Sequence, residues 1–239
     1  NLTNLSNIEE FIEKNSITFL SSVPSMWKTI IKLTDRMKKK VLRKVHIGSA
    51  PLSADLWNEV IDWGQGCEVV NMYGITETAN WFSGASSLNF KPKDGLVGTP
   101  WGGQAGVLSK GIISHRGEGE IVLLTPSIML YYYQQQPLTK KAFFNNWYRT
   151  GDIGIIDNAT IQIKGRIKNE INRAGLKVIP EDIDILLEKN PVINEACTFG
   201  IKDEILGEKV CVAVVIKKGK AYKVLELKKW MEKQITMEK

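Results

Sequence analysis

Helical and strand-like hydrophobic patterns alternate over the first 75 residues, and this alternation restricts the possible fold more than any other feature. Apolar residues recur at helical spacing in three segments, and a short apolar run follows each of them. The expected helices are 7–17, 26–33 and 53–64, and the expected strands are 18–24, 41–48 and 67–74. Ser53 is a typical helix cap and Gly64 a typical helix end. Strands and helices that alternate at this spacing predict a parallel sheet.

The pattern changes twice after this region. Beyond Trp101 the chain consists of short apolar runs separated by glycine turns, which predicts antiparallel, barrel-like strands. From about Lys168 the pattern reads as helix, strand, strand and a last amphipathic helix from Lys223. We therefore expect an α/β fold whose large domain has two parts, followed by a small α+β carboxyl-terminal domain joined at about 165–168. The expected divisions are 1–105 for the parallel α/β subdomain, 106–165 for the β-rich subdomain and 166–239 for the small domain.

Composition excludes several classes of function. The formal net charge of +6 comes from lysines dispersed along the chain. No aromatic and basic residues interleave, so the charge favours a solvated surface and not nucleic-acid binding. No apolar run reaches membrane-spanning length and no signal peptide opens the chain, so we expect no membrane span.

The cysteines favour neither a metal site nor a disulfide framework. Cys67, Cys197 and Cys211 are odd in number and far apart, they form no CxxC pair, and the chain has two histidines. Buried, reduced thiols in a cytoplasmic protein are the simpler interpretation.

The segment VVNMYGITETAN, residues 69–80, is the first candidate site. A strand that ends at Tyr73 and Gly74 places Thr76 and Glu77 at the carboxyl edge of the sheet, where open α/β sheets bind ligands. The same letters also fit a plain turn followed by a capped helix that opens at Thr76. Both interpretations stay open on this segment alone.

Two later blocks give this segment a context. WYRTGDIGIID (147–157) and IKGRIKNEINRAGLKVIPEDI (163–183) follow YGITE in order. Together the three blocks resemble the adenylate-forming, or AMP-binding, superfamily, which includes acyl- and aryl-CoA synthetases, peptide-synthetase adenylation domains and luciferases. Segments such as LRKVHIGSAPLS and GEGEIVLLTPSIMLYYY extend the resemblance over nearly the whole chain.

The resemblance implies a nucleotide site for ATP or AMP with Mg²⁺. Tyr73, beside Gly74, would stack on the adenine ring, and Thr76 would bind the α-phosphate. Glu77 would hold Mg²⁺ through a hard oxygen ligand. Asp152, expected in a surface cleft, would accept both ribose hydroxyls, because a carboxylate is an acceptor-only group. The backbone of the loop after the second strand would line the adenine pocket, through Gly48, Ser49, Ala50 and Pro51.

The resemblance also implies parts that move. Arg166 would approach the ribose and phosphate, so that Thr76, Glu77 and Arg166 form the expected catalytic set. Lys168 occupies the position of the family's hinge. Gly175 belongs to a segment that would close over the pantetheine arm of the thiol acceptor. Many relatives have two glycines there, whereas this chain has Ala174 first, which is strained by roughly 1 kcal/mol if that position needs a positive φ.

The implied reaction is activation of a carboxylic acid by ATP to an acyl-adenylate, followed by transfer to CoA or to carrier-protein phosphopantetheine. The block at 163–183 looks closer to CoA ligases than to peptide-synthetase domains. The chain begins with Asn1 and contains neither a Gly/Ser/Thr-rich phosphate loop nor the family's late lysine. We therefore expect a carboxyl-terminal part of a ligase that is inactive alone. The alternative is a non-catalytic module of the same fold that binds a nucleotide or a carrier protein.

Overall fold

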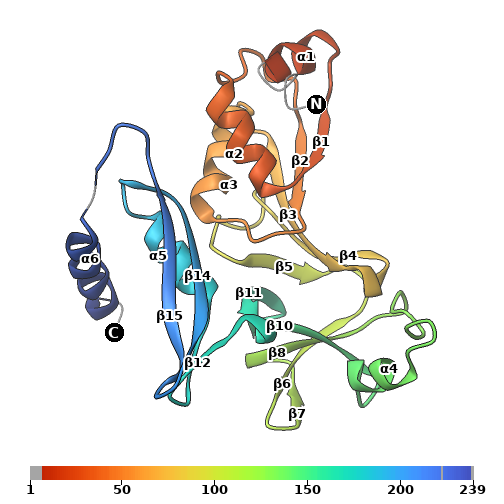
Figure 1. Cartoon of the computed structure of the whole chain (residues 1–239). Helices are drawn as coiled ribbons and strands as arrows, with labels where there is room; N and C mark the ends of the chain where they lie inside the picture. Colours follow the sequence, from red (N-terminus) through yellow and green to blue (C-terminus); the bar gives the residue numbers. More distant parts are fainter. Residues whose placement is uncertain (1–6, 222, 238–239) are drawn as a thin grey trace. The chain divides into compact units, whose positions relative to one another are not determined.

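The computed structural model describes residues 7–221 and 223–237 (Figure 1). The chain divides into two compact units, Asn1–Ile163 and Lys164–Lys239. This division lies within a few residues of the linker expected from the sequence, and each unit is described by itself below.

The first unit begins with the parallel sheet that the sequence predicted. Strands β1, β2 and β3 pair in parallel, and helices α2 and α3 pack side by side against them (Figure 1). Their bounds are α1 (Ile8–Lys14), β1 (Phe19–Ser22), α2 (Pro24–Leu33), β2 (Lys44–Gly48), α3 (Ala54–Trp63) and β3 (Glu68–Ile75). The Ser53 hydroxyl accepts a hydrogen bond from the Leu56 amide at 3.2 Å, and α3 ends at Gly64. Both predicted helix signals are therefore confirmed.

A single apolar core lies between the helices and this sheet. It includes Trp27 of α2, Trp57 of α3 and Val69 of β3, all with 0% exposure. Burial of these side chains stabilises the packing of the helices on the sheet and so holds β2 and β3 in place. The candidate site lies at the carboxyl ends of these two strands.

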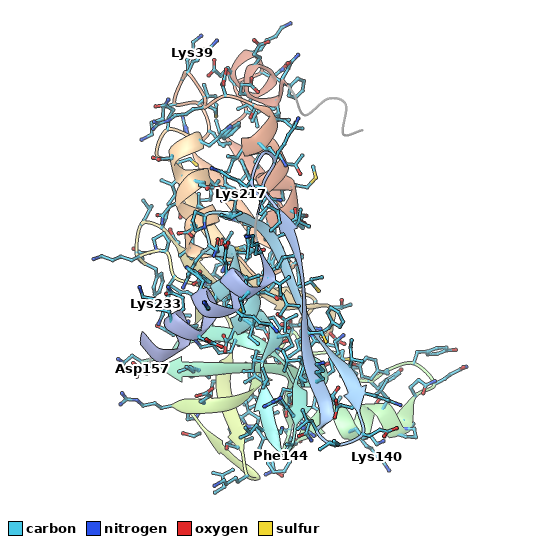
Figure 2. The ribbon with its side chains drawn as sticks, turned by 60° about the vertical axis from the view of Figure 1, so that its left-hand side comes forward. Lys39, Lys140, Phe144, Asp157, Lys217 and Lys233 are labelled. Carbon is cyan, nitrogen blue, oxygen red and sulfur yellow. The ribbon has the colours of Figure 1, made fainter. Side chains whose placement is uncertain are left out.

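The rest of the first unit is antiparallel, as predicted, but it continues the same sheet. Among the described residues, eleven strands follow the order β1-β2-β3-β4-β5-β11-β10-β8-β6-β7, with β9 paired to β10. The added elements are β4 (Asn80–Ser86), β5 (Leu96–Pro100), β6 (Gln104–Ser109), β7 (Ile112–Ser114), β8 (Gly117–Leu124), α4 (Gln136–Ala142), β9 (Phe143–Phe144), β10 (Trp147–Asp157) and β11 (Thr160–Arg166). The boundary between the two units, after Ile163, falls within β11. Lys39 and Lys140 lie at opposite ends of the first unit (Figure 2), as expected for dispersed lysines.

The second unit is the predicted small α+β domain. In the described part of the chain it holds a four-stranded sheet in the order β13-β12-β15-β14, and α5 packs on β14. The bounds are β12 (Ile171–Arg173), β13 (Leu176–Val178), α5 (Pro180–Glu188), β14 (Ile193–Asp203), β15 (Gly207–Ile216) and α6 (Val224–Met237). No helix among the described residues is long and apolar enough to cross a bilayer.

The three cysteines are free thiols, but they are not all buried as expected. Cys67 is buried behind α3, and burial raises the pKa of its thiol to about 11. Cys197 is exposed on β14, because it lies on the face opposite to the buried Thr198. Cys211 is half-buried on the neighbouring strand.

Two hairpins carry alanine where the backbone is left-handed. Asn158 and Ala159 join β10 to β11 with φ of 47° and 61°, and Ala174 and Gly175 join β12 to β13 with φ of 52° and 87°. Two consecutive positive φ angles are typical of a type I′ turn, which favours Asn-Gly. Ala174 therefore has the positive φ at which an alanine is strained.

Replacing Ala174 with glycine is expected to raise the free energy of unfolding of the second unit by about 0.5 kcal/mol. Relief of left-handed strain contributes about 1 kcal/mol or more, and the greater freedom of glycine in the unfolded chain offsets about half of that. Urea unfolding measures the difference. Ala213→Gly is the matched control, because Ala213 lies in strand β15 and its φ is not positive. Destabilisation by Ala174→Gly as large as that by Ala213→Gly would contradict the prediction.

Candidate functional site

The turn after β3 is shorter than the sequence indicated. A helix opening at Thr76 is wrong: residues Thr76–Thr78 form one turn of 3₁₀ helix (η2), and the antiparallel strand β4 follows at once. The buried Thr78 side chain closes this turn, since its Oγ1 lies 2.9 Å from the Ile75 carbonyl and 3.0 Å from the Asn80 carbonyl. Thr76 is exposed and Glu77 half-buried.

Gly74 is required by a close approach of two backbones. A Cβ atom built at this position would lie 1.9 Å from the Asn80 carbonyl oxygen. The pairing of β3 with β4 shifts register between Tyr73 and Gly74, so that Tyr73 faces Ser83 while Gly74 faces Trp81. The missing side chain therefore allows the bulge that turns the chain back toward η2.

The loop after β2 lies beside this turn. Gly48 is the register partner of Met72, so the carboxyl ends of β2 and β3 meet at one edge of the sheet. A Cβ atom at Gly48 would lie 2.8 Å from the Met72 carbonyl and equally close to the Trp81 ring. Ser49, Ala50 and Pro51 are exposed. The first unit thus brings Gly48–Pro51 and Tyr73–Glu77 to one location, as expected for a ligand site at this edge.

Tyr73 and Asp152 come into direct contact from segments 79 residues apart. The Tyr73 hydroxyl donates to Asp152 Oδ2 at 2.6 Å. A hydrogen bond to a carboxylate at this distance is of the strong, charge-assisted kind. Asp152 has 2% exposure, so the expectation of a surface carboxylate is wrong. Asp152 lies in β10, which is an interior strand of the sheet between β11 and β8.

A second carboxylate holds the residues of β10 that precede Asp152. Glu120 of β8 has 8% exposure, and its Oε2 accepts from Arg149 Nε at 2.9 Å and from a terminal nitrogen of the same guanidinium at 2.7 Å. Its Oε1 accepts from the Gly151 amide at 3.2 Å. The Thr150 hydroxyl donates to the Ile121 carbonyl at 2.7 Å. Burial of a charge requires such pairing, and the result is a fixed backbone leading into Asp152.

Two tyrosines that the sequence analysis did not single out are linked to Glu77, one directly and one through the other. The Tyr132 hydroxyl donates to Glu77 Oε1 at 2.7 Å, and the Tyr148 hydroxyl lies 3.0 Å from that of Tyr132. Burial raises the pKa of both tyrosines, and for Tyr132 the hydrogen bond to Glu77 adds to this rise in pKa. In the sequence, these two tyrosines are marked only by the YYY run, which contains Tyr132, and by the position of Tyr148 just before RTGD.

The chemistry of this carboxylate fits Mg²⁺ bound together with phosphates. Among the residues that the structure describes, no group of three or more His, Cys, Asp or Glu side chains could hold a metal ion. Protein sites for Mg²⁺ on phosphorylated substrates use one or two carboxylates, and phosphate oxygens and water supply the other ligands. Glu77 is a hard oxygen donor on a short, fixed turn, which suits that role.

The remaining predicted residues lie in the second unit. Arg166 ends β11 and is exposed, and Lys168 is exposed in a 3₁₀ turn, η3 (Ile167–Asn169). The Asn169 side chain donates to Glu181 Oε1 at 2.8 Å, which ties η3 to α5. Gly175 is exposed at the β12–β13 turn, and its amide donates to Asn172 Oδ1 at 3.0 Å. The roles of Arg166 toward the nucleotide, of Lys168 as the hinge and of Gly175 toward the thiol acceptor stay predictions.

Comparison with known proteins gives consistent matches. The profile of a family described as AMP-binding enzyme matches residues 3–133, and that of the AMP-binding enzyme C-terminal domain matches residues 182–237. An oxalate–CoA ligase of Arabidopsis thaliana is 28% identical over 234 residues, covering 94% of this chain and 45% of that protein. The mitochondrial medium-chain acyl-CoA ligase ACSF2 of Danio rerio is 31% identical, with 94% and 38% covered. The chain thus spans less than half the length of these relatives.

Solved structures show the same fold. ATP-bound MatB from Rhodopseudomonas palustris superposes with a TM-score of 0.86 at 26% identity, covering 97% of this chain and 46% of that one. MenE from Bacillus subtilis, in complex with ATP and magnesium, gives a TM-score of 0.81 at 24% identity, with 95% and 47% covered. At that identity the second likeness concerns the fold alone.

Proposed function

This chain belongs to the AMP-binding enzyme family, and we propose that the protein activates a carboxylic acid with ATP and transfers the acyl group to CoA. In the first step an oxygen of the acid attacks the α-phosphorus, and pyrophosphate leaves. In the second step the thiol sulfur attacks the acyl carbon, its proton is lost, and AMP leaves. The names of the relatives, oxalate–CoA ligase and medium-chain acyl-CoA ligase, support CoA as the acceptor.

The contact between Tyr73 and Asp152 is the observation that carries this proposal. It joins the YGITE and RTGD motifs, 79 residues apart, into one site. With Oδ2 engaged by the tyrosine, the carboxylate can still accept bonds from a ribose diol, because an ionised carboxylate has about four lone-pair positions. The tyrosine ring is held at the same time, so its face can stack on a base.

Glu77 and Thr76 complete the phosphate side of the site. The Glu77 carboxylate would ligate Mg²⁺, and the exposed Thr76 hydroxyl would donate to an α-phosphate oxygen. Mg²⁺, when bound, would neutralise the charge of the phosphates. Catalysis in such a site is positioning together with electrostatic stabilisation.

The second unit would supply the groups that change between the two steps. Arg166 would meet the ribose and phosphate, and rotation at Lys168 would exchange it for the turn at Ala174 and Gly175. The exposed position of all four residues supports this role. The hydrogen bond between Asn169 and Glu181 is a contact that fixes η3 to α5 on one side of the proposed hinge.

We also propose that the protein is cytoplasmic. Cys197 is an exposed free thiol, and such a thiol persists in a reducing compartment.

Calorimetric titration of the 239-residue chain with a non-hydrolysable acyl-adenylate analogue and Mg²⁺ tests the proposal. We expect binding at one site per chain, at least tenfold tighter than that of AMP, because the acyl group adds apolar contact. A folded chain, checked by circular dichroism, that binds neither ligand would contradict the proposal. Pyrophosphate exchange into ATP is measured on the whole protein, because the 239-residue chain is expected to be inactive alone. A whole protein that binds the analogue and exchanges no pyrophosphate would support the non-catalytic module instead.

A further inference from the structure

Glu77 is reached by a chain of two hydroxyl groups that come from other elements of the first unit. Tyr132 lies in the connection between β8 and α4, and its hydroxyl is 2.7 Å from Glu77 Oε1. Tyr148 lies on β10, and its hydroxyl is 3.0 Å from that of Tyr132. Three segments that are distant in sequence are therefore linked by two consecutive hydrogen bonds that end at one carboxylate oxygen of Glu77.

The two hydrogen bonds are both donated toward Glu77, from Tyr148 to Tyr132 and from Tyr132 to the carboxylate. Tyrosine hydroxyls keep their proton near neutral pH, whereas an ionised carboxylate can only accept. The Tyr132 proton is therefore committed to Glu77, and the Tyr132 oxygen is left to accept from Tyr148. Each hydroxyl polarises the next, so the second tyrosine strengthens the bond that the first one makes.

The two tyrosines are themselves held in place. Tyr148 has 5% exposure, and its ring stands edge-on to that of Phe143, with centroids 5.5 Å apart. The Tyr132 amide donates to the Thr139 hydroxyl at 2.9 Å, which ties it to α4. The Met129 amide donates to the Glu77 carbonyl at 2.7 Å. The main chain and the side chain of Glu77 are thus both fixed by the same connection.

We propose that Tyr132 is a positioning residue, whose hydroxyl, backed by Tyr148, orients Glu77 to ligate a nucleotide-bound divalent cation. This inference rests on the proposed function. A glutamate side chain has three rotatable bonds, and Mg²⁺ requires near-ideal octahedral geometry, so an unrestrained carboxylate pays an ordering entropy at binding. The bond to Oε1 removes that freedom and leaves the second oxygen of the carboxylate for the cation. Partners that orient a metal-binding carboxylate typically contribute 10-fold to 100-fold to metal affinity.

The test is the Mg²⁺ dependence of ATP binding, measured by calorimetry on the 239-residue chain. For Tyr132→Phe we expect the Mg²⁺ concentration at half-maximal ATP binding to rise about tenfold, with near-normal ATP affinity at saturating Mg²⁺. Tyr148→Phe should give a smaller rise, about threefold, because its hydroxyl acts through Tyr132. Tyr133→Phe is the matched control: Tyr133 has 80% exposure and should leave the dependence unchanged.

A double variant separates positioning from packing. With Glu77→Gln in place, Tyr132→Phe should have no further effect on the Mg²⁺ dependence, since the oriented group is already neutral. A Tyr132→Phe protein that loses ATP affinity equally at every Mg²⁺ concentration, or that keeps the wild-type dependence, overturns the inference while leaving the proposed function intact. A wild-type chain whose ATP binding does not respond to Mg²⁺ overturns the inference together with the metal role of Glu77.

Discussion

Replacing Asp152 with asparagine is expected to weaken binding of the acyl-adenylate analogue by at least a hundredfold. The carboxylate would accept two ribose hydroxyls as well as the Tyr73 hydroxyl, and a hydrogen bond to a charged group contributes about 1.5–3 kcal/mol. The amide has one oxygen in place of two, so at least one of these bonds is lost, and the others lose their charge assistance. Losses of this size correspond to about two powers of ten or more in affinity.

The buried position of Asp152 decides the choice of variant. Asp152 has 2% exposure, so truncation to alanine would leave a void and would deprive the Tyr73 hydroxyl of its acceptor. Loss of binding could then follow from misfolding. Asparagine keeps the shape. Asp157→Asn is the matched control, because Asp157 lies on the same strand, labelled in Figure 2, in an exposed ion pair with Arg116 at 3.0 Å. Equal affinities of the two variants would refute the ribose role of Asp152.

Replacing Gly74 with alanine is expected to destabilise the first unit by about 3 kcal/mol or more. The added methyl would overlap the Asn80 carbonyl oxygen at 1.9 Å and approach the Trp81 Cα at 2.7 Å. These are backbone atoms, so no side-chain rotation relieves the clash, and β3 and β4 must separate. Overpacking of this kind typically costs about 1–3 kcal/mol, and more where the backbone itself must move.

Chemical unfolding of the chain measures this effect. Gly102→Ala is the control, because a Cβ atom there meets nothing within 4 Å and its φ is not in the left-handed region. We expect that control to change stability by less than about 0.5 kcal/mol. A Gly74→Ala protein as stable as the Gly102→Ala protein would show that β3 and β4 do not approach as closely as described.

The sequence predicted those parts of the fold that depend on local patterns. The strands and helices before Gly74 follow from apolar spacing, and the cap at Ser53 follows from its position before a helical run. The turn after Gly74 could not be predicted from the sequence, and the helix interpretation proved wrong, because Thr76 and Glu77 are equally typical of a helix start. Contacts with other parts of the structure prevent a helix here. The Thr78 hydroxyl lies within hydrogen-bonding distance of two carbonyls, and β4 pairs with β3, so a helix cannot continue.

Only those residues of the candidate site that lie in a recognised family motif could be predicted from the sequence. Tyr73, Glu77 and Asp152 were identified through a family resemblance, and the structure adds the contact between the first and the last of them. Tyr132 and Glu120 were missed because their roles lie in partners 55 and 29 residues away, which no local spacing encodes. The same reason explains why Asp152 was expected at the surface.

The hydrogen bond between Tyr73 and Asp152 has a consequence for how the protein folds. Its two ends close a loop of 79 residues, so the chain must lose the entropy of that loop before the bond forms. Contacts of such long range form late in folding, after the local helices and adjacent strands. Competence to bind a nucleotide should therefore appear among the last events of refolding. A ligand that binds this site will stabilise the native state of the first unit by an amount that grows with the logarithm of its concentration once that concentration exceeds the dissociation constant.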